Sequence, residues 1–192
     1  MKRAALLVTI LGLVSLAGCQ GAVAQAPLQP VPHVELPRYM GSWYVVASIP
    51  TRFERSSYNP VETYRMQPDG RICTSFRFHE GGFEGPVKKI HSVATVDSDS
   101  GNAEWKVHLF WILREQYIVA WLAPDYSRVI VARDARDYTW LMARTPYVTP
   151  AEYQDMLRRL PAMGYDLSKL RKSPQRWPEA GSQPARFGES CR

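Results

Sequence analysis

Residues 104–112 read EWKVHLFWI, a stretch in which apolar and polar side chains alternate along the chain. One face collects four large apolar side chains: Trp105, Val107, Leu109 and Trp111. The opposite face carries Lys106 and His108. Because successive side chains of a β-strand point to opposite sides of the sheet, this period of two predicts a strand with one buried face.

Seven further segments rich in β-branched and aromatic residues surround this stretch, at intervals of roughly ten residues. They cover residues 42–49, 62–66, 71–78, 87–96, 117–122, 129–133 and 138–143. Pro68-Asp69-Gly70 between two of them is a strong signal for a tight turn. The pattern predicts an all-β fold, either an eight-stranded antiparallel up-and-down β-barrel or a sandwich. An eight-stranded barrel is wide enough to be filled by side chains or to hold one small ligand.

A helix signal interrupts this pattern late in the chain. Thr149-Pro150-Ala151-Glu152 combines an N-cap threonine, a proline at the first helical position and a glutamate three residues after the cap. The apolar residues that follow recur at helical spacing: Tyr153, Met156, Leu157 and Leu160. Gly164 is the expected stop, and residues 166–170 are a candidate for one more short strand.

Length and composition support one compact domain, or at most two small ones. The chain has 192 residues, of which 22% are charged and 45% hydrophobic, which excludes a collagen-like, low-complexity or mostly disordered chain. The formal net charge of +6 is compatible with an anionic partner such as a membrane surface. No basic cluster supports nucleic-acid binding, and we predict none.

The N-terminus has the organisation of an export signal. Lys2 and Arg3 precede an apolar stretch over residues 4–17, which is too short for a transmembrane helix. It ends in Leu16-Ala17-Gly18-Cys19, which resembles a bacterial lipobox. We therefore predict a signal peptide over residues 1–18 and an acylated Cys19 that anchors the chain in a membrane; an ordinary secretory signal cut after Ala24 is the alternative. Gln20 favours the outer membrane. We predict that the anchored protein lies on the periplasmic side of that membrane. Residues 19–37 are predicted to form the anchor and a flexible, proline-rich tether.

Three ordered motifs carry a resemblance to a known family: Gly41-Ser42-Trp43-Tyr44, Pro124-Asp125-Tyr126 and Arg144. On these motifs, and on matching strings at residues 53–55, 137–140, 144–146 and 164–169, the chain resembles the lipocalins. The resemblance is closest to the bacterial outer-membrane lipocalin lipoproteins and covers about residues 36–171. It implies a barrel with its flanking helix over residues 38–171 and a tail over residues 172–192. It also implies that five residues close one end of the barrel rather than contact a ligand: Gly41, Trp43, Asp125, Tyr126 and Arg144.

The resemblance further implies a fatty acid or lysophospholipid held in the barrel. Strand alternation, together with the position of Phe53 near the family's open end, gives the candidate lining residues: Phe53, Phe76, Phe78, Trp105, Val107, Leu109, Trp111, Tyr117, Val119, Trp121, Tyr138, Trp140 and Met142. A one-residue bulge would invert any of these strands. Of the lining residues, three are the best candidates for the rim: Phe53, Phe78 and Tyr117. Five basic residues are candidates for contact with a lipid head group: Arg52, Arg55, Arg77, Lys88 and Lys89.

Two cysteines remain once Cys19 is acylated. In an envelope compartment two such thiols usually pair, and many lipocalins tie a C-terminal tail to the barrel in this way. We predict a Cys73–Cys191 disulfide, with a free terminal thiol as the alternative. By strand parity Cys73 faces away from Ile72, on the outside of the barrel.

The predicted function is to carry or scavenge a small hydrophobic lipid at the bacterial envelope, as a monomer or homodimer. No catalytic residue, metal or cofactor is predicted, because the chain has no Gly-x-Ser-x-Gly, no glycine-rich phosphate loop and no metal-ligand spacing among its four histidines. Three alternatives stay open: a structural lipoprotein with a filled barrel, a haem-binding barrel and a ligand isomerase.

Overall fold

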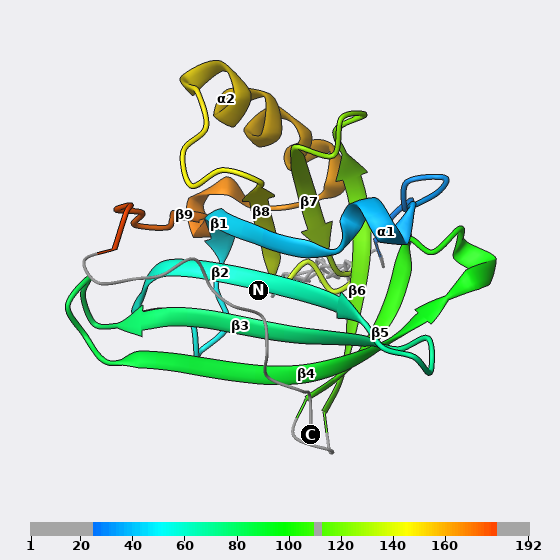
Figure 1. Cartoon of the computed structure of the whole chain (residues 1–192). Helices are drawn as coiled ribbons and strands as arrows, with labels where there is room; N and C mark the ends of the chain where they lie inside the picture. The colour runs from blue at the N-terminus through cyan, green and yellow to red at the C-terminus, as the bar shows by residue number, and fades with distance from the viewer. Residues whose placement is uncertain (1–24, 110–112, 180–192) are drawn as a thin grey trace, which may run out of the picture.

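In the computed structural model, which describes residues 25–109 and 113–179, nine strands form one antiparallel sheet that closes into a barrel (Figure 1). The strands are β1 (Gly41–Ile49), β2 (Ser57–Met66), β3 (Ile72–Glu80), β4 (Val87–Asp97), β5 (Glu104–Leu109), β6 (Leu113–Leu122), β7 (Arg128–Ala132), β8 (Thr139–Ala143) and β9 (Arg171–Lys172). Each of the strands β2 to β8 pairs with its neighbour along the chain, and β1 pairs with both β2 and β8. Because that double pairing closes the sheet, the predicted eight-stranded barrel is confirmed and the sandwich alternative is wrong.

The helical segments lie outside the strands. They are α1 (Leu36–Tyr39), α2 (Pro150–Arg159) and three short 3-10 helices, η1 (Ser98–Ser100), η2 (Pro161–Met163) and η3 (Leu167–Lys169). Helix α2 begins where the sequence predicts, because Thr149 and Glu152 form a capping box. The predicted strand at residues 166–170 is wrong: a 3-10 helix occupies those residues, and the two-residue β9 follows it and pairs with β1.

Two separate apolar cores result from this arrangement. One fills the closed half of the barrel interior, around Trp43 and Trp105. The other lies between α2 and the outer face of the barrel, where Met156 and Leu160 pack with Ile130 and Leu141 (Figure 1). The barrel is therefore covered by the helix on one side while its interior remains a separate compartment.

β-Bulges decide which residues belong to which core. In β1 the register shifts between Val45 and Ala47, so that Val45 faces the interior and Ala47 faces α2. In β6 the register shifts between Val119 and Trp121, so that Val119 faces the interior and Trp121 faces α2. The predicted inward orientation of Trp121 is therefore wrong. A single extra residue reverses every side chain beyond it, and the sequence carries no signal for that residue.

The segment before the barrel is more ordered than a tether. Leu28 and Val34 are buried, the latter completely. The Val31 amide donates to the Val119 carbonyl at 2.8 Å, and the Val34 amide donates to the Gly101 carbonyl at the same distance. Residues 25–35 thus pack against the barrel, from the loop between β7 and β8, where the Leu28 amide donates to Asp134 at 2.7 Å, to the closed end, and the predicted flexible tether does not extend over them.

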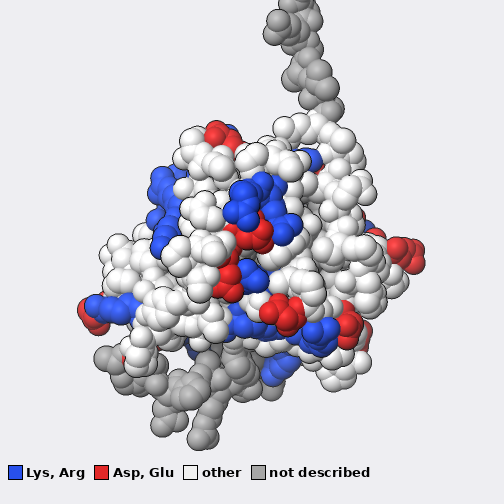
Figure 2. Space-filling model, turned by 90° about the horizontal axis from the view of Figure 1, so that it is seen from above, with Lys and Arg blue, Asp and Glu red and all other residues white. Residues whose placement is uncertain are grey.

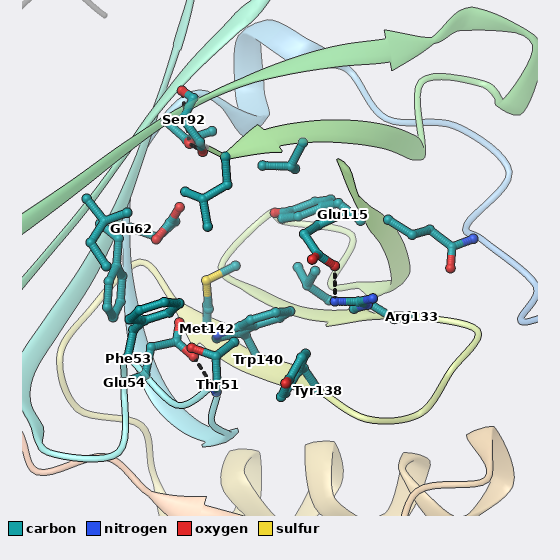
Figure 3. Close-up of a pocket in the computed structure, with 18 of the residues that line it drawn as sticks. Thr51, Phe53, Glu54, Glu62, Ser92, Glu115, Arg133, Tyr138, Trp140 and Met142 are labelled. Carbon is teal, nitrogen blue, oxygen red and sulfur yellow. Dashed lines mark hydrogen bonds and ion pairs between the residues drawn. The ribbon is translucent and has the colours of Figure 1, made fainter. Parts of the chain in front are cut away.

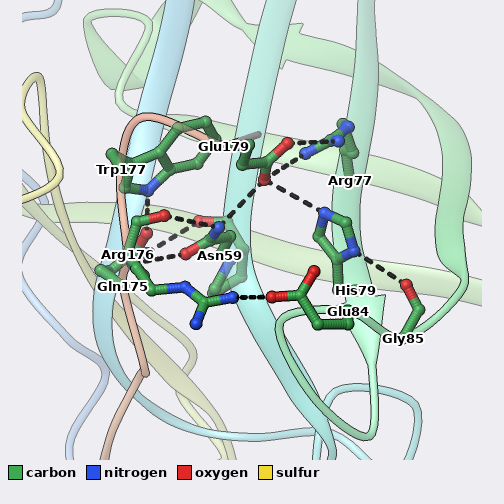
Figure 4. A network of polar contacts seen from close by, with 10 residues as sticks. Asn59, Arg77, His79, Glu84, Gly85, Gln175, Arg176, Trp177 and Glu179 are labelled. Carbon is green, nitrogen blue, oxygen red and sulfur yellow. Dashed lines mark hydrogen bonds and ion pairs between the residues drawn. The ribbon is translucent and has the colours of Figure 1, made fainter. Parts of the chain in front are cut away.

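The start of the C-terminal tail is also held against the barrel. The Ser173 amide donates to the Val46 carbonyl, and Asn59 exchanges hydrogen bonds with the backbone of Arg176 (Figure 4). The Arg77 guanidinium pairs with both carboxylate oxygens of Glu179 at 2.9 and 2.7 Å. Asn59 lies at the bulge in β2, where its φ of 48° is left-handed. Strand β2 begins at Ser57, before this bulge, and not at residue 62 as predicted.

Candidate functional site

One end of the barrel is closed by an arginine that lies over a tryptophan. The Arg144 guanidinium stands 3.8 Å from the centre of the Trp43 ring, a cation–π arrangement. It also donates to three backbone carbonyls, of Ser42 at 2.9 Å, Arg38 at 2.6 Å and Tyr39 at 3.0 Å. These contacts hold α1 across the end of the barrel.

The other residues predicted to close the barrel support the same end. Gly41 has a φ of +94°, a conformation that a side chain would strain, and Arg144 lies directly beside it. The Tyr126 hydroxyl accepts from the Glu35 amide at 2.9 Å, and this bond ties the loop between β6 and β7 to the residue that precedes α1. Asp125 accepts from the amide and hydroxyl of Ser127, and these bonds lower the pKa of its carboxyl. All five residues therefore lie outside the cavity.

Above this closure lies a layer of aromatic side chains that forms the floor of the interior. The Tyr117 hydroxyl contacts the hydroxyls of Tyr39 at 2.6 Å and Tyr64 at 2.8 Å, and burial raises the pKa of all three phenols. Trp105 stacks on Tyr117 with ring centres 4.5 Å apart. Tyr117 is thus at the floor rather than the rim, because β6 pairs it with Trp105 near the closed end of β5.

Between the floor and the opposite end, the barrel encloses a cavity of about 310 Å³ (Figure 3). This volume is at the lower end of the range typical of small-molecule sites. Eight of the predicted lining residues border it: Phe53, Phe76, Val107, Leu109, Tyr117, Tyr138, Trp140 and Met142. Ile90, which the sequence reading did not single out, also lines it. We name this cavity the cup.

The remaining predicted lining residues lie elsewhere. Phe78, Trp105 and Val119 face the interior but belong to its packed core and do not border the cup. Trp121 lies outside the barrel, where the Arg159 guanidinium stands 4.3 Å from its ring centre. Trp111 lies outside the described residues. The cup is therefore shorter than alternation alone predicted, because the Trp105 ring stacks on Tyr117 in the floor and the Phe78 ring packs on Phe76.

Acidic side chains also line the cup, and sequence reasoning missed them. Glu54 accepts from the Thr51 amide at 2.8 Å and from the Trp140 indole at 3.0 Å, while burial raises the pKa of its carboxyl. Glu62 points into the cavity from β2 (Figure 3). Its burial, together with the nearby charge of Glu54, raises its pKa to about 8. Only the parity of β2, in which Glu62 shares a face with Tyr64, could have indicated this.

Replacing Glu62 with glutamine should stabilise the protein increasingly as the pH rises. Between its ordinary pKa of 4.5 and its folded value of about 8, the folded chain holds a proton that the unfolded chain has lost. Raising the pH through this window therefore lowers the free energy of unfolding of the wild type, and Glu62→Gln removes that loss. We expect little difference near pH 5 and a gain of at least about 1 kcal/mol near pH 9, measured by urea unfolding. Glu80→Gln, at an exposed site paired with Lys88, is the control, and a gain independent of pH would contradict the assignment.

Basic residues are fewer at the cup than predicted. Arg52 lines it and lies over the Phe53 ring at 4.6 Å, where Phe53 is 39% exposed. Arg77 faces outward and pairs with Glu179, and Arg55, Lys88 and Lys89 do not border the cavity. Arg133, which was not predicted, pairs with Glu115 at the cavity wall (Figure 3). Arg52 is thus the only one of the five candidates for head-group contact that borders the cup.

The other predicted features are placed as follows. Cys73 is buried and alternates with Ile72 and Thr74, so it faces away from the interior as predicted; Cys19 and Cys191 lie outside the described residues.

Within residues 25–109 and 113–179, no group of three or more His, Cys, Asp or Glu side chains is placed to hold a metal ion. None of the helices described in those ranges is long and apolar enough to cross a membrane. On the face that carries α2, acidic and basic side chains are interspersed, and Arg158 and Arg159 both pair with Asp155 (Figure 2).

Comparison with known proteins agrees with this architecture. The temperature-induced lipocalin-1 of Arabidopsis thaliana is 30% identical over 154 residues, covering 77% of this chain and 83% of the relative. The outer membrane lipoprotein Blc of Vibrio cholerae is 30% identical over 162 residues, covering 84% and 93%. Among solved structures, insecticyanin from the tobacco hornworm Manduca sexta superposes with a TM-score of 0.63 at 13% identity, covering 82% of this chain and 88% of insecticyanin, a likeness of fold alone.

The chain also matches a protein family. The Lipocalin-like domain family matches residues 34–175, a range that begins just before α1 and ends in the segment after β9. It includes the arginine–tryptophan closure, the aromatic floor and the cup. The protein therefore belongs to the Lipocalin-like domain family.

Proposed function

We propose that the protein binds one single-chain lipid, of the fatty acid or lysophospholipid class, and carries or scavenges it at the bacterial envelope. The observation that supports this most directly is the cup itself, an open space in a closed barrel whose wall includes Phe76, Ile90, Val107 and Met142. The family to which the chain belongs consists of proteins that bind small hydrophobic ligands. A binding role rather than catalysis is what this wall supports.

The energetics of such a complex are favourable. Apolar surface transferred from water to protein gains about 25 cal/mol per Å², so an alkyl chain enclosed by this wall gains several kcal/mol. Because β-pairing fixes the wall before the ligand enters, little ordering of the protein opposes binding. The floor of buried tyrosines limits how far the chain can enter.

Envelope location is supported by the relatives and by the N-terminal sequence. The relatives from Citrobacter freundii and Vibrio cholerae are both named outer membrane lipoprotein Blc. The lipobox at Leu16-Ala17-Gly18-Cys19 is the expected point of attachment. Several acyl chains on Cys19 would hold the protein firmly, since each buried methylene contributes about 0.8 kcal/mol.

Calorimetric titration of the purified protein with a lysophospholipid tests this proposal. We expect one ligand per chain and a dissociation constant of about a micromolar or tighter, with a negative heat-capacity change from buried apolar surface. Sub-micellar ligand concentrations keep micelle formation from contributing to the heat. Absence of binding by every acyl ligand tested would favour a structural lipoprotein with a filled barrel and overturn the proposal.

A further inference from the structure

The inner part of the cup contains a carboxyl group without a protein partner. Glu62 points into the cavity from β2 (Figure 3). Within residues 25–109 and 113–179, no hydrogen bond or ion pair reaches its carboxyl, and the Glu62 side chain is half-buried. Water can therefore reach this carboxyl, and a ligand that fills the cavity would exclude that water.

Its depth in the barrel shows which part of a ligand it would meet. In the register of the sheet, Glu62 lies between Trp43 on β1 and Phe76 on β3. It is two residues from Tyr64, whose hydroxyl belongs to the floor. Arg52 and Phe53 instead lie in the loop between β1 and β2, beyond the last residue of β1. Glu62 would therefore contact the end of a ligand that enters first.

The charged groups around Glu62 leave the inner cup acidic. Glu54 lies in the same loop as Arg52, but its carboxyl accepts from the Trp140 indole at the cavity wall, and its charge raises the pKa of Glu62. The wall arginine does not compensate, because Arg133 already pairs with Glu115 and Asp137. Arg144 lies below the floor, engaged with Trp43 and backbone carbonyls, and the floor itself presents neutral phenols.

These surroundings discriminate between possible ligand ends. A hydrocarbon end would leave Glu62 without a hydrogen bond, and a carboxylate end would meet the charge of Glu54. An ammonium group has three donors and no acceptor, so it can satisfy Glu62 and offset both acidic groups. A nearby cation favours the ionised form of a carboxyl, so an ammonium group would shift Glu62 to the carboxylate and form a charge-assisted hydrogen bond that offsets its own desolvation.

We propose that the inner end of the cup binds the protonated amine of a single-chain aliphatic amine, with Glu62 as its hydrogen-bond acceptor and Glu54 as the second negative group. The hydrocarbon chain then extends along Val107, Leu109 and Met142 toward the open end. This inference rests on the proposed binding of one single-chain lipid in the cup, and it differs from that proposal in naming an amine, rather than a fatty acid, as the ligand that binds most tightly.

Three ligands that share one chain length test the inference: dodecylamine, dodecanol and dodecanoate, each titrated below its micelle-forming concentration. For the wild type we expect dodecylamine to bind at least about tenfold more tightly than dodecanoate, a difference of about 1.4 kcal/mol. In Glu62→Gln this preference should fall to about twofold or less, while dodecanol binding persists. The control Glu80→Gln, on the exposed end of β3, should keep the full preference.

The outcomes separate this inference from the proposed function. Equal affinities for all three ligands, or tighter binding of dodecanoate, would overturn the inference and leave lipid binding intact. Failure of all three to bind would overturn both. Dodecanol binding by Glu62→Gln shows that its cup is folded; if that variant does not fold, Glu54→Gln replaces it and should also reduce the preference. An unchanged preference in a folded Glu62→Gln would likewise overturn the assignment.

Discussion

Replacing Arg144 with methionine should lower the free energy of unfolding by about 3 kcal/mol or more. Methionine keeps most of the aliphatic length of arginine but removes the hydrogen bonds to the carbonyls of Ser42, Arg38 and Tyr39. A hydrogen bond from a charged donor contributes about 1.5–3 kcal/mol, and the main loss here is at Ser42, because the Tyr39 carbonyl keeps the Trp43 indole as a donor at 2.9 Å and the bond to Arg38 is exposed. Loss of the guanidinium over the Trp43 ring adds about 0.5–2 kcal/mol.

Urea unfolding followed by tryptophan fluorescence measures this loss, because Trp43 is fully buried at the closed end. Arg158→Met is the matched control, since Arg158 is largely exposed on α2 and pairs only with a helix neighbour, Asp155. The control should change stability by about 0.5 kcal/mol or less. Equal effects of the two substitutions would contradict the role assigned to Arg144.

The second large effect is expected from filling the cup. Val107→Trp places an indole in the cavity of about 310 Å³, on a wall position of β5. We expect lysophospholipid affinity to fall at least about a hundredfold, roughly 2.7 kcal/mol, because the ligand and the new ring need the same space. The barrel should remain folded, since the ring enters space that no side chain occupies.

Lys106→Trp is the control for this experiment, because Lys106 is the neighbouring residue on the same strand and its side chain is exposed. The two variants carry the same new side chain on opposite faces of one strand. Affinity should be unchanged in Lys106→Trp. If Val107→Trp bound lipid as the wild type does, the ligand would have to lie elsewhere than in the cup.

The fold could be predicted because its signals are local. Alternation in residues 104–112 and the turn signals between segments are properties of neighbouring residues, and they require eight antiparallel strands. The capping box at Thr149 fixed the start of α2 in the same way. The strand at residues 166–170 failed because Asp166 accepts from the Ser168 amide, a local bond that favours the 3-10 turn.

The site could be predicted only in part, because it depends on contacts between distant strands. Alternation placed Val107, Leu109, Trp140 and Met142 correctly at the cup. It failed at Trp121, since the bulge in β6 is a property of the pairing with β7 and not of the β6 sequence. Glu54 and Glu62 were missed because an acidic residue in a strand ordinarily indicates an exposed face.

The most direct test of the central claim is mass spectrometry of lipids extracted from the protein purified with its native membrane. The account predicts about one non-covalently bound single-chain lipid per wild-type chain, retained in Lys106→Trp and absent from Val107→Trp. Either an absence of bound lipid in the wild type or an equal amount in all three proteins would contradict a ligand-binding cup.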